Sequence, residues 1–206
     1  MLTRPSITNQ RLMEVIIKVP TGTDVEKINR FFSMFRFTNL SIGKRSEIEA
    51  RAAAQTSEAT PYFVNVVPGL DGLVESDFER YLESGSCSLL FFNDQVAEDS
   101  EPKVIYTTDH SPRAYRNLER FKELKPAGFS GATVISEGDA LNSKISLNDM
   151  SRQILEKIKS TVQSTQANLI IASYDFGNTG RKKAQIANVV KMVRQNKCHV
   201  LILKTY

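Results

Sequence analysis

The stretch that decides the fold runs from Ala167 to Tyr206. It opens with Ala-Asn-Leu-Ile-Ile-Ala-Ser-Tyr (167–174), a continuous apolar run typical of a parallel strand buried on both faces. Asp-Phe-Gly-Asn-Thr-Gly (175–180) follows and has the composition of a loop. Residues 181–196 then carry apolar side chains at helical spacing, and residues 198–203 form a second apolar run. The stretch therefore predicts a strand, a crossover helix and a second parallel strand.

A polar residue ends each of these two strands. Asp175 closes the first strand and Lys204 closes the second. The carboxyl ends of neighbouring parallel strands meet at one edge of the sheet, and open α/β sheets bind their ligands at that edge. We expect Asp175 and Lys204 to approach within hydrogen-bond distance or the span of one water molecule. A salt bridge at a strand edge explains such a pair as well as a functional site does.

Composition limits the class of protein. The chain has 206 residues, of which 41% are hydrophobic, so it has enough apolar side chains for a substantial core. A net charge of +4 and a pI of about 9.0 suit a polyanionic partner without requiring one. Two cysteines, two histidines and the lack of any long apolar run predict a soluble, cytoplasmic protein without a structural metal and without membrane contact. The sequence shows no internal repeat.

Strand-like and helix-like segments alternate along the remaining chain, which predicts an α/β fold with a doubly wound, mainly parallel Rossmann-like sheet over residues 38–206. Residues 1–37 are expected to form a small α+β extension, in which a capping box starts a helix near residue 23. A polar turn near 38–46 and an Ala-rich helix over 46–57 are expected next. The predicted parallel strands are 62–67, 88–92, 132–136, 168–174 and 199–204, with the first and fourth adjacent and a further edge strand at 103–107.

Three features after the predicted strands are candidates for cofactor binding. A turn containing Gly69 and Gly72 follows the first strand, and glycines at such a turn let the backbone approach a ligand closely. Asp94 follows the second strand, where Rossmann-like folds bind a ribose hydroxyl, and Asp139 follows the third. A plain tight turn and solvated aspartates explain the same residues.

These motifs resemble those of S-adenosylmethionine-dependent methyltransferases. More narrowly, Leu169–Asp175 and Val200–Tyr206, with its Leu-x-Lys-Thr-Tyr ending, resemble the cap methyltransferase region in the large polymerase proteins of non-segmented negative-strand RNA viruses. The resemblance covers about residues 38–206. It implies a Rossmann-like methyltransferase sheet, S-adenosylmethionine as cofactor, and capped RNA and the rest of a polymerase protein as partners.

The resemblance also implies a site. That family uses a Lys-Asp-Lys-Glu tetrad, and Lys44, Asp175 and Lys204 match its first three members, although Arg45 competes with Lys44 for the alignment. Lys204, with a pKa lowered by desolvation and by Lys44, would assist the attacking ribose 2′-hydroxyl, and Asp175 would orient it. The glycines and aspartates named above would bind the cofactor. RNA phosphates would contact Arg181, Lys182 and Lys183, which otherwise form an ordinary solvated helix face.

Two departures from the family keep other functions open. The turn at 68–72 has fewer glycines than the family motif, and the chain ends after the fifth strand, without the glutamate of the tetrad. The chain is then a fragment of a methyltransferase or an incomplete relative of one. A non-catalytic Rossmann-like interaction module is the main alternative, and a nucleotide-binding enzyme of another kind is a third.

Overall fold

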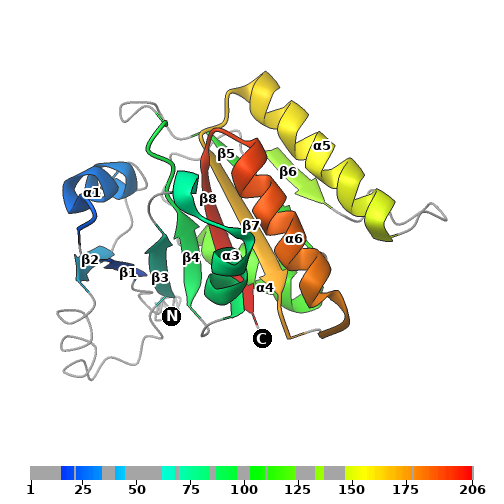
Figure 1. Ribbon diagram of the computed structural model, residues 1–206, viewed down its shortest axis with the longest axis horizontal. Helices are drawn as coiled ribbons and strands as arrows, with labels where there is room; N and C mark the ends of the chain where they lie inside the picture. The colour runs from blue at the N-terminus through cyan, green and yellow to red at the C-terminus, as the bar shows by residue number, and fades with distance from the viewer. Residues whose placement is uncertain are drawn as a thin grey trace, which may run out of the picture.

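The computed structural model describes residues 15–20, 22–33, 40–44, 62–67, 70–83, 87–96, 103–109, 111–123, 133–136, 147–177 and 179–205. The strands are β1 (Val15–Val19), β2 (Leu40–Lys44), β3 (Tyr62–Val67), β4 (Ser88–Phe91), β5 (Val104–Thr108), β6 (Thr133–Ser136), β7 (Leu169–Asp175) and β8 (His199–Thr205). The helices are α1 (Val25–Ser33), the 3-10 turn η1 (Leu70–Gly72), α3 (Glu75–Glu83), α4 (Pro112–Glu123), α5 (Leu147–Thr165) and α6 (Thr179–Gln195). Figure 1 shows the strands side by side in one sheet.

All eight strands belong to a single sheet in the order β2-β1-β3-β4-β8-β7-β5-β6. Every neighbouring pair is parallel except β4 and β8, which are antiparallel. The predicted doubly wound, mainly parallel α/β fold is therefore confirmed. Because of the one antiparallel pair, however, β1 to β4 point in one direction and β5 to β8 point in the other.

Several details of the predicted sheet are wrong, beginning with the strands at 88–92 and 199–204, which were expected to be parallel and pair antiparallel. The strands at 62–67 and 168–174 are not adjacent, because β3 pairs with β1 and β4 while β7 pairs with β5 and β8. The strand at 103–107 lies inside the sheet, between β7 and β6, and is not at its edge. The turn expected near 38–46 contains β2, and the strand expected in the N-terminal extension is β1, which belongs to the same sheet. The helix expected at 46–57 lies outside the described residues.

The strand order reveals an internal repeat that the sequence did not show. The first four strands lie in the order β2-β1-β3-β4, counted from one edge of the sheet to its centre. The last four lie in the order β6-β5-β7-β8, counted from the other edge to the centre. Both halves therefore have the same order, which is second, first, third and fourth strand. The two halves join through their fourth strands, where Leu90 is paired with Leu201. An approximate two-fold axis at this pair relates the two halves.

The strand registers show which residues are equivalent in the two halves. Because Val64 lies beside Ser88 in one half and Leu169 beside His199 in the other, Val64 is equivalent to Leu169. The same reasoning makes Ile17 equivalent to Val104. Counting on from those two residues matches Asp24 with Ser111.

Asp24 and Ser111 have the same structural role, which supports the repeat. The Asp24 carboxylate accepts hydrogen bonds from the backbone N–H groups of Glu26 and Lys27 at the start of α1. The Ser111 hydroxyl accepts one from the Ala114 N–H at the start of α4. Both are N-caps, which satisfy amide donors that the first helical turn leaves without partners.

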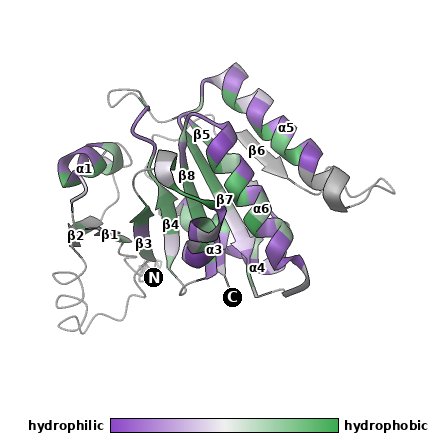
Figure 2. Ribbon diagram, viewed as in Figure 1, coloured by the Kyte–Doolittle hydropathy of each residue, from purple (hydrophilic) through white to green (hydrophobic). Residues whose placement is uncertain are grey.

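Helices cover both faces of the sheet and bury two apolar layers (Figures 1 and 2). On one face α1 and α4 contribute Phe31, Phe32, Leu118 and Phe121, which pack over β-strand residues such as Leu201. On the other face α3, α5 and α6 cover a layer that includes phenylalanine, isoleucine and valine side chains. Equivalent helices lie on the same face, as a two-fold axis perpendicular to the sheet requires.

No helix in the described ranges is long and apolar enough to cross a bilayer.

Candidate functional site

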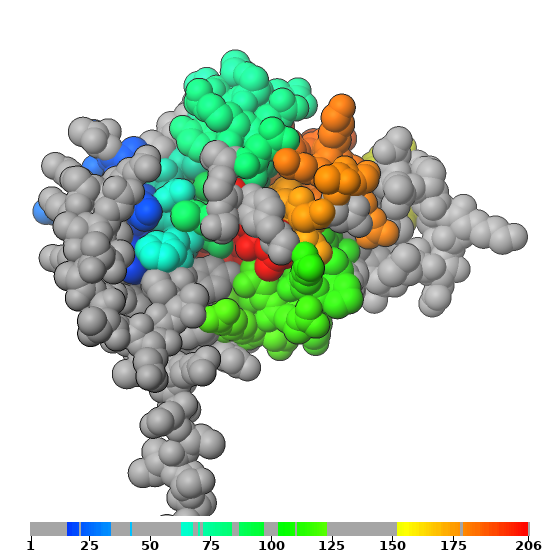
Figure 3. Space-filling model, turned by 90° about the horizontal axis from the view of Figure 1, so that it is seen from below, coloured from blue at the N-terminus to red at the C-terminus, as the bar shows by residue number. Residues whose placement is uncertain are grey.

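Because the two halves point in opposite directions, carboxyl ends of strands lie at both edges of the sheet. The carboxyl ends of β5, β7 and β8 lie at one edge of the sheet, and those of β1 to β4 lie at the other. Figure 3 views the molecule from the side where β8 ends, in red, between residues of α4 in green and of β7 and α6 in orange. In the second half, β6 pairs with one side of β5, and β7, the next strand along the chain, pairs with the other side of β5. The topological switch point, where such sheets bind ligands, therefore lies between β5 and β7.

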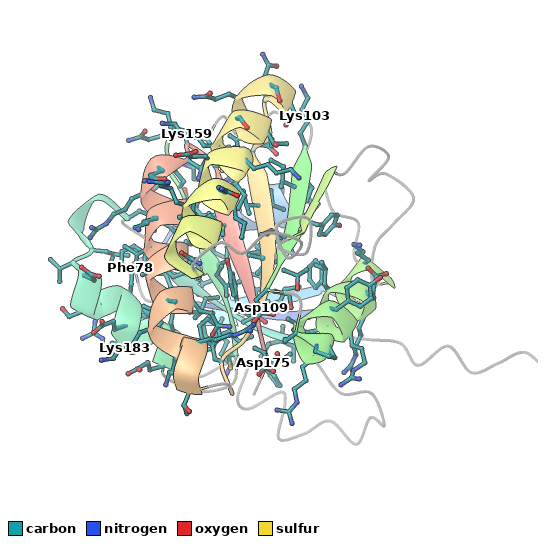
Figure 4. The ribbon with its side chains drawn as sticks, turned by 90° about the vertical axis from the view of Figure 1, so that its right-hand side faces the viewer. Phe78, Lys103, Asp109, Lys159, Asp175 and Lys183 are labelled. Atoms are coloured by element: carbon teal, nitrogen blue, oxygen red, sulfur yellow. The ribbon has the colours of Figure 1, made fainter. Side chains whose placement is uncertain are left out.

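Asp109 occupies this switch point directly after β5, and it is 5% exposed. Its Oδ1 accepts a hydrogen bond from the Ser111 N–H (2.9 Å), and its Oδ2 accepts from the Asp175 N–H (2.9 Å) and from Gln185 Nε2 (2.7 Å). One carboxylate thus connects the end of β5, the end of β7 and the helix α6. Figure 4 shows Asp109 and Asp175 together near the start of α6. Asp109 was not among the residues predicted from the sequence, although it has the same signal as Asp94, an aspartate directly after an apolar strand.

Two further polar atoms close to this carboxylate are buried. Thr107 lies on the same face of the sheet as Asp109 because side chains two residues apart on a strand share a face. Its Oγ1 and the Oε1 atom of Gln185 have no hydrogen-bond partner among the described residues. Buried polar atoms of this kind are uncommon in folded proteins, and a bound ligand or water usually satisfies them.

The predicted pair of Asp175 and Lys204 is not formed as expected. The register pairs Tyr174 with Lys204 and Asp175 with Thr205. Adjacent residues of a strand point to opposite faces, so the Asp175 and Lys204 side chains leave the sheet on opposite sides. The Asp175 Oδ1 instead accepts the Gly177 N–H at 3.0 Å in a local turn. The prediction placed both residues at the correct strand ends but ignored this alternation.

Lys204 serves the packing between the halves. It is buried, and its Nζ donates to the backbone carbonyl of Tyr81 in the last turn of α3 (3.3 Å). Burial lowers the pKa of Lys204 to about 8; the nearby Cys87 opposes this shift, and Lys182 adds to it. The expected lowering of the pKa by desolvation is thus present, but the second cation is Lys182 and not Lys44.

The remaining predicted residues lie at the other edge or outside the described chain. Lys44 ends β2, four strands from β8, and its side chain is outside the described residues. Gly72 belongs to η1, and Asp94 follows β4 and forms a salt bridge with Lys27 (3.2 Å). Gly69 and Asp139 lie outside the described residues. The sheet therefore does not bring Lys44, Gly72 or Asp94 to the edge where Asp175 and Lys204 lie.

The predicted RNA-binding residues begin α6. Arg181 and Lys183 are exposed there, whereas Lys182 forms a salt bridge with Glu83 at 3.2 Å. Binding of S-adenosylmethionine and of RNA stays a prediction from the sequence. Among the described residues no group of histidine, cysteine, aspartate and glutamate side chains has the arrangement of a metal site.

His199 is a buried ionisable group near the seam between the halves. It is 3% exposed, its Nδ1 accepts the Asn93 N–H at 3.1 Å, and its ring stacks on Phe92 with centroids 4.3 Å apart. Burial lowers the pKa of His199 to about 4, although Asp94 raises it and Lys27 lowers it further. The imidazole is therefore neutral in the folded protein at neutral pH.

This shift predicts an acid-sensitive stability. A folded pKa of about 4 lies below the usual value of 6.5, so the unfolded chain binds the proton first as the pH falls. The free energy of unfolding should then decrease between about pH 6.5 and pH 4. Urea titrations across that range will measure the slope, and His199→Phe should flatten it. An equally steep slope in His199→Phe would show that other groups cause the acid sensitivity.

Two solved structures resemble this chain in their fold, whereas its sequence has no match among known families. No protein-family model matches the sequence, and no curated protein matches it. A functionally unknown protein from Pseudomonas aeruginosa PAO1 is similar in structure, with 12% identity, a TM-score of 0.47, and coverage of 94% of this chain and 93% of that one. A putative universal stress protein from Pseudomonas aeruginosa UCBPP-PA14 gives 11% identity, a TM-score of 0.47, and coverage of 95% and 94%. Similarity at this level does not transfer a function.

These structures are not viral polymerase methyltransferases, and the resemblance to that family is wrong, as are the predicted cap methylation and viral origin. The sheet gives the physical reason. The antiparallel pairing of β4 with β8 places Gly72 and Asp94 at the edge opposite Asp175, so these two predicted cofactor residues do not meet the predicted catalytic residue. The apolar runs that end in Asp175 and Lys204 are those of buried parallel strands in general.

Proposed function

We propose that this chain is a non-catalytic Rossmann-like module that binds a nucleotide-class ligand at the switch point between β5 and β7. The observation that carries the proposal is the Asp109 carboxylate, which fixes the ends of both strands and the first turns of α6 around this point. A carboxylate offers about four lone-pair sites and three are used here, so Asp109 acts mainly as a positioning residue.

The start of α6 supplies the binding chemistry. Thr179 is its first residue and is exposed at the same edge of the sheet. The first amide groups of a helix have no partners within the helix and favour an anion such as phosphate. Arg181 and Lys183 add positive charge to the first turns of α6. A ligand for this site would place a phosphate at the start of α6. It would place hydroxyl groups near Thr107 Oγ1 and Gln185 Oε1, which have no partner among the described residues. A nucleotide has both kinds of group.

The repeat explains why only the second half is proposed to bind. Counting on from the equivalent residues Ile17 and Val104, the position of Asp109 in the first half is Gly22, which has a φ of 87°. A glycine has no carboxylate with which to hold the ends of β1 and β3 together.

The free thiols of Cys87 and Cys198 fit the reducing cytoplasm in which we place the protein.

Thr179→Glu tests this proposal without disturbing the fold. A carboxylate at the start of a helix stabilises it but repels a phosphate, so nucleotide affinity should fall about tenfold while thermal stability is kept. Isothermal titration with ATP and AMP will measure the affinity, with Thr179→Gln as the uncharged control. If nucleotides do not bind at millimolar concentration, or bind Thr179→Glu and Thr179→Gln equally, the proposal is wrong. Methyl transfer from S-adenosylmethionine to RNA by this chain would also contradict it.

A further inference from the structure

A pocket of about 400 Å³ lies at the opposite edge of the sheet, where the two halves meet. Residues from both halves line it: Leu70, Leu73, Asn93 and Gln95 follow β3 and β4, whereas Val193, Arg194, Asn196 and Lys197 come from the end of α6 and the loop before β8. Its volume is near the lower end of the range for small-molecule sites. It is separate from the proposed nucleotide site, which lies at the other edge.

The internal repeat shows which side chain is equivalent to the pocket residue Asn93 in the other half. Since Leu90 is equivalent to Leu201, Asn93 is equivalent to Lys204, and Tyr81 is equivalent to Met192. On one side of the axis the Lys204 side chain fills the corresponding space and donates to the Tyr81 carbonyl. On the other side Asn93 is too short to do this, and Asn196 Nδ2 binds the Met192 carbonyl at 2.8 Å. At the pocket, therefore, no lysine takes the place that Lys204 has on the other side of the axis.

The cationic side chains of the pocket favour an anion. Arg194 and Lys197 line it, and none of its eight described lining residues is acidic. The Arg194 guanidinium is fixed by a hydrogen bond to the Leu73 carbonyl (3.1 Å) and by its position 5.6 Å from the centre of the Phe78 ring. A guanidinium has five N–H donors in a planar fork that suits phosphate, so a fixed Arg194 has donors to offer a ligand.

The amide side chains add a preference for hydroxyl groups. Asn196 is 5% exposed, and the bond to Met192 fixes its orientation, yet its Oδ1 has no hydrogen-bond partner among the described residues. A buried acceptor without a donor is unfavourable, because it has lost its hydrogen bonds to water. A hydroxyl group on a ligand would supply the donor. Asn93 and Gln95 offer both donors and acceptors to further hydroxyls at the same pocket.

We infer that this pocket binds a small phosphorylated polyol, with its phosphate at Arg194 and Lys197 and its hydroxyl groups at Asn93, Gln95 and Asn196. The positive charges of Arg194 and Lys197, with no acidic residue among the described lining residues, would attract the phosphate. The three amide side chains would form hydrogen bonds with the hydroxyl groups. Leu70, Leu73 and Val193 provide apolar contact for the carbon skeleton.

Isothermal titration with glucose 6-phosphate, glucose and inorganic phosphate tests the inference on the whole chain. Glucose 6-phosphate should bind, and Lys197→Gln and Arg194→Gln should each weaken it about tenfold, as expected for the loss of a charge-assisted phosphate contact. Lys191→Gln is the matched control, because Lys191 is exposed on α6 and does not line the pocket. Asn93→Met should also weaken binding by filling the space.

Several results would overturn the inference. One is that glucose 6-phosphate does not bind at millimolar concentration. A second is that Lys191→Gln and Lys197→Gln lose affinity for glucose 6-phosphate equally. A third is that phosphate alone binds as tightly as the sugar phosphate. Thr179→Glu should leave glucose 6-phosphate binding unchanged, because Thr179 lies at the other edge of the sheet. This variant separates a failure of the pocket from a failure of the proposed nucleotide site.

Discussion

A chain carrying Leu201→Asp should fail to fold, and neither half should remain folded by itself. Leu201 is 2% exposed and is paired with Leu90, which is fully buried, at the centre of the seam between the halves. Removing a buried leucine side chain alone costs about 2–5 kcal/mol. An ionised carboxylate in the same place adds several kcal/mol more, against a total stability of roughly 5–15 kcal/mol.

Circular dichroism during urea unfolding will measure this effect. The unchanged protein should unfold in one transition, because residues of both halves share each of the two apolar layers. Leu201→Asp should show no transition. Val74→Asp is the matched control, since Val74 is 57% exposed and a carboxylate there remains in water. A cooperative transition of reduced size in Leu201→Asp would show that one half folds independently.

Asp109→Ala should destabilise the protein by about 3–5 kcal/mol, because three N–H donors would lose their acceptor at a buried position. Alanine removes the acceptor of the Ser111 and Asp175 N–H groups and leaves Gln185 Nε2 with only its longer bond to the Asp175 carbonyl (3.3 Å). Asp109→Asn keeps the volume and one acceptor oxygen, but it directs an NH₂ group at one of these donors, so its effect should be smaller but clear. Thermal and urea unfolding will measure both variants.

Asp175→Asn is the matched control for Asp109. Its carboxylate also follows a strand at the same edge of the sheet, but the bond described for it is a local one to the Gly177 N–H, which an amide oxygen can also accept. We expect a loss of less than about 1 kcal/mol. If Asp175→Asn and Asp109→Ala destabilise the protein equally, Asp109 does not have the positioning role proposed for it.

Local sequence patterns predicted the elements of the second half well. Apolar runs placed β7 and β8, and the spacing of apolar side chains placed α6. These signals succeed because burial on both faces and helix capping act between residues close in the chain. They failed at β2, because the polar residues around its short apolar segment have the composition of a turn.

The candidate site depended on relations that local patterns do not contain. Asp175 and Lys204 were correctly placed at strand ends, yet a register that pairs Asp175 with Thr205 sends the two side chains to opposite faces. Register is set by contacts between strands distant in sequence. Asp109 was missed for the same reason, since its importance comes from donors on β7 and α6 and not from its own neighbours.

The sequence by itself determined that this protein is a doubly wound, mainly parallel α/β protein, because alternating apolar strands and amphipathic helices allow few other solutions. Only the tertiary structure decided that β4 meets β8 antiparallel and joins two similar halves about an axis at Leu90 and Leu201. An apolar strand has the same composition in either direction, so the pattern cannot specify which neighbour it pairs with. That single pairing decides which polar residues share an edge, and therefore where a ligand can bind.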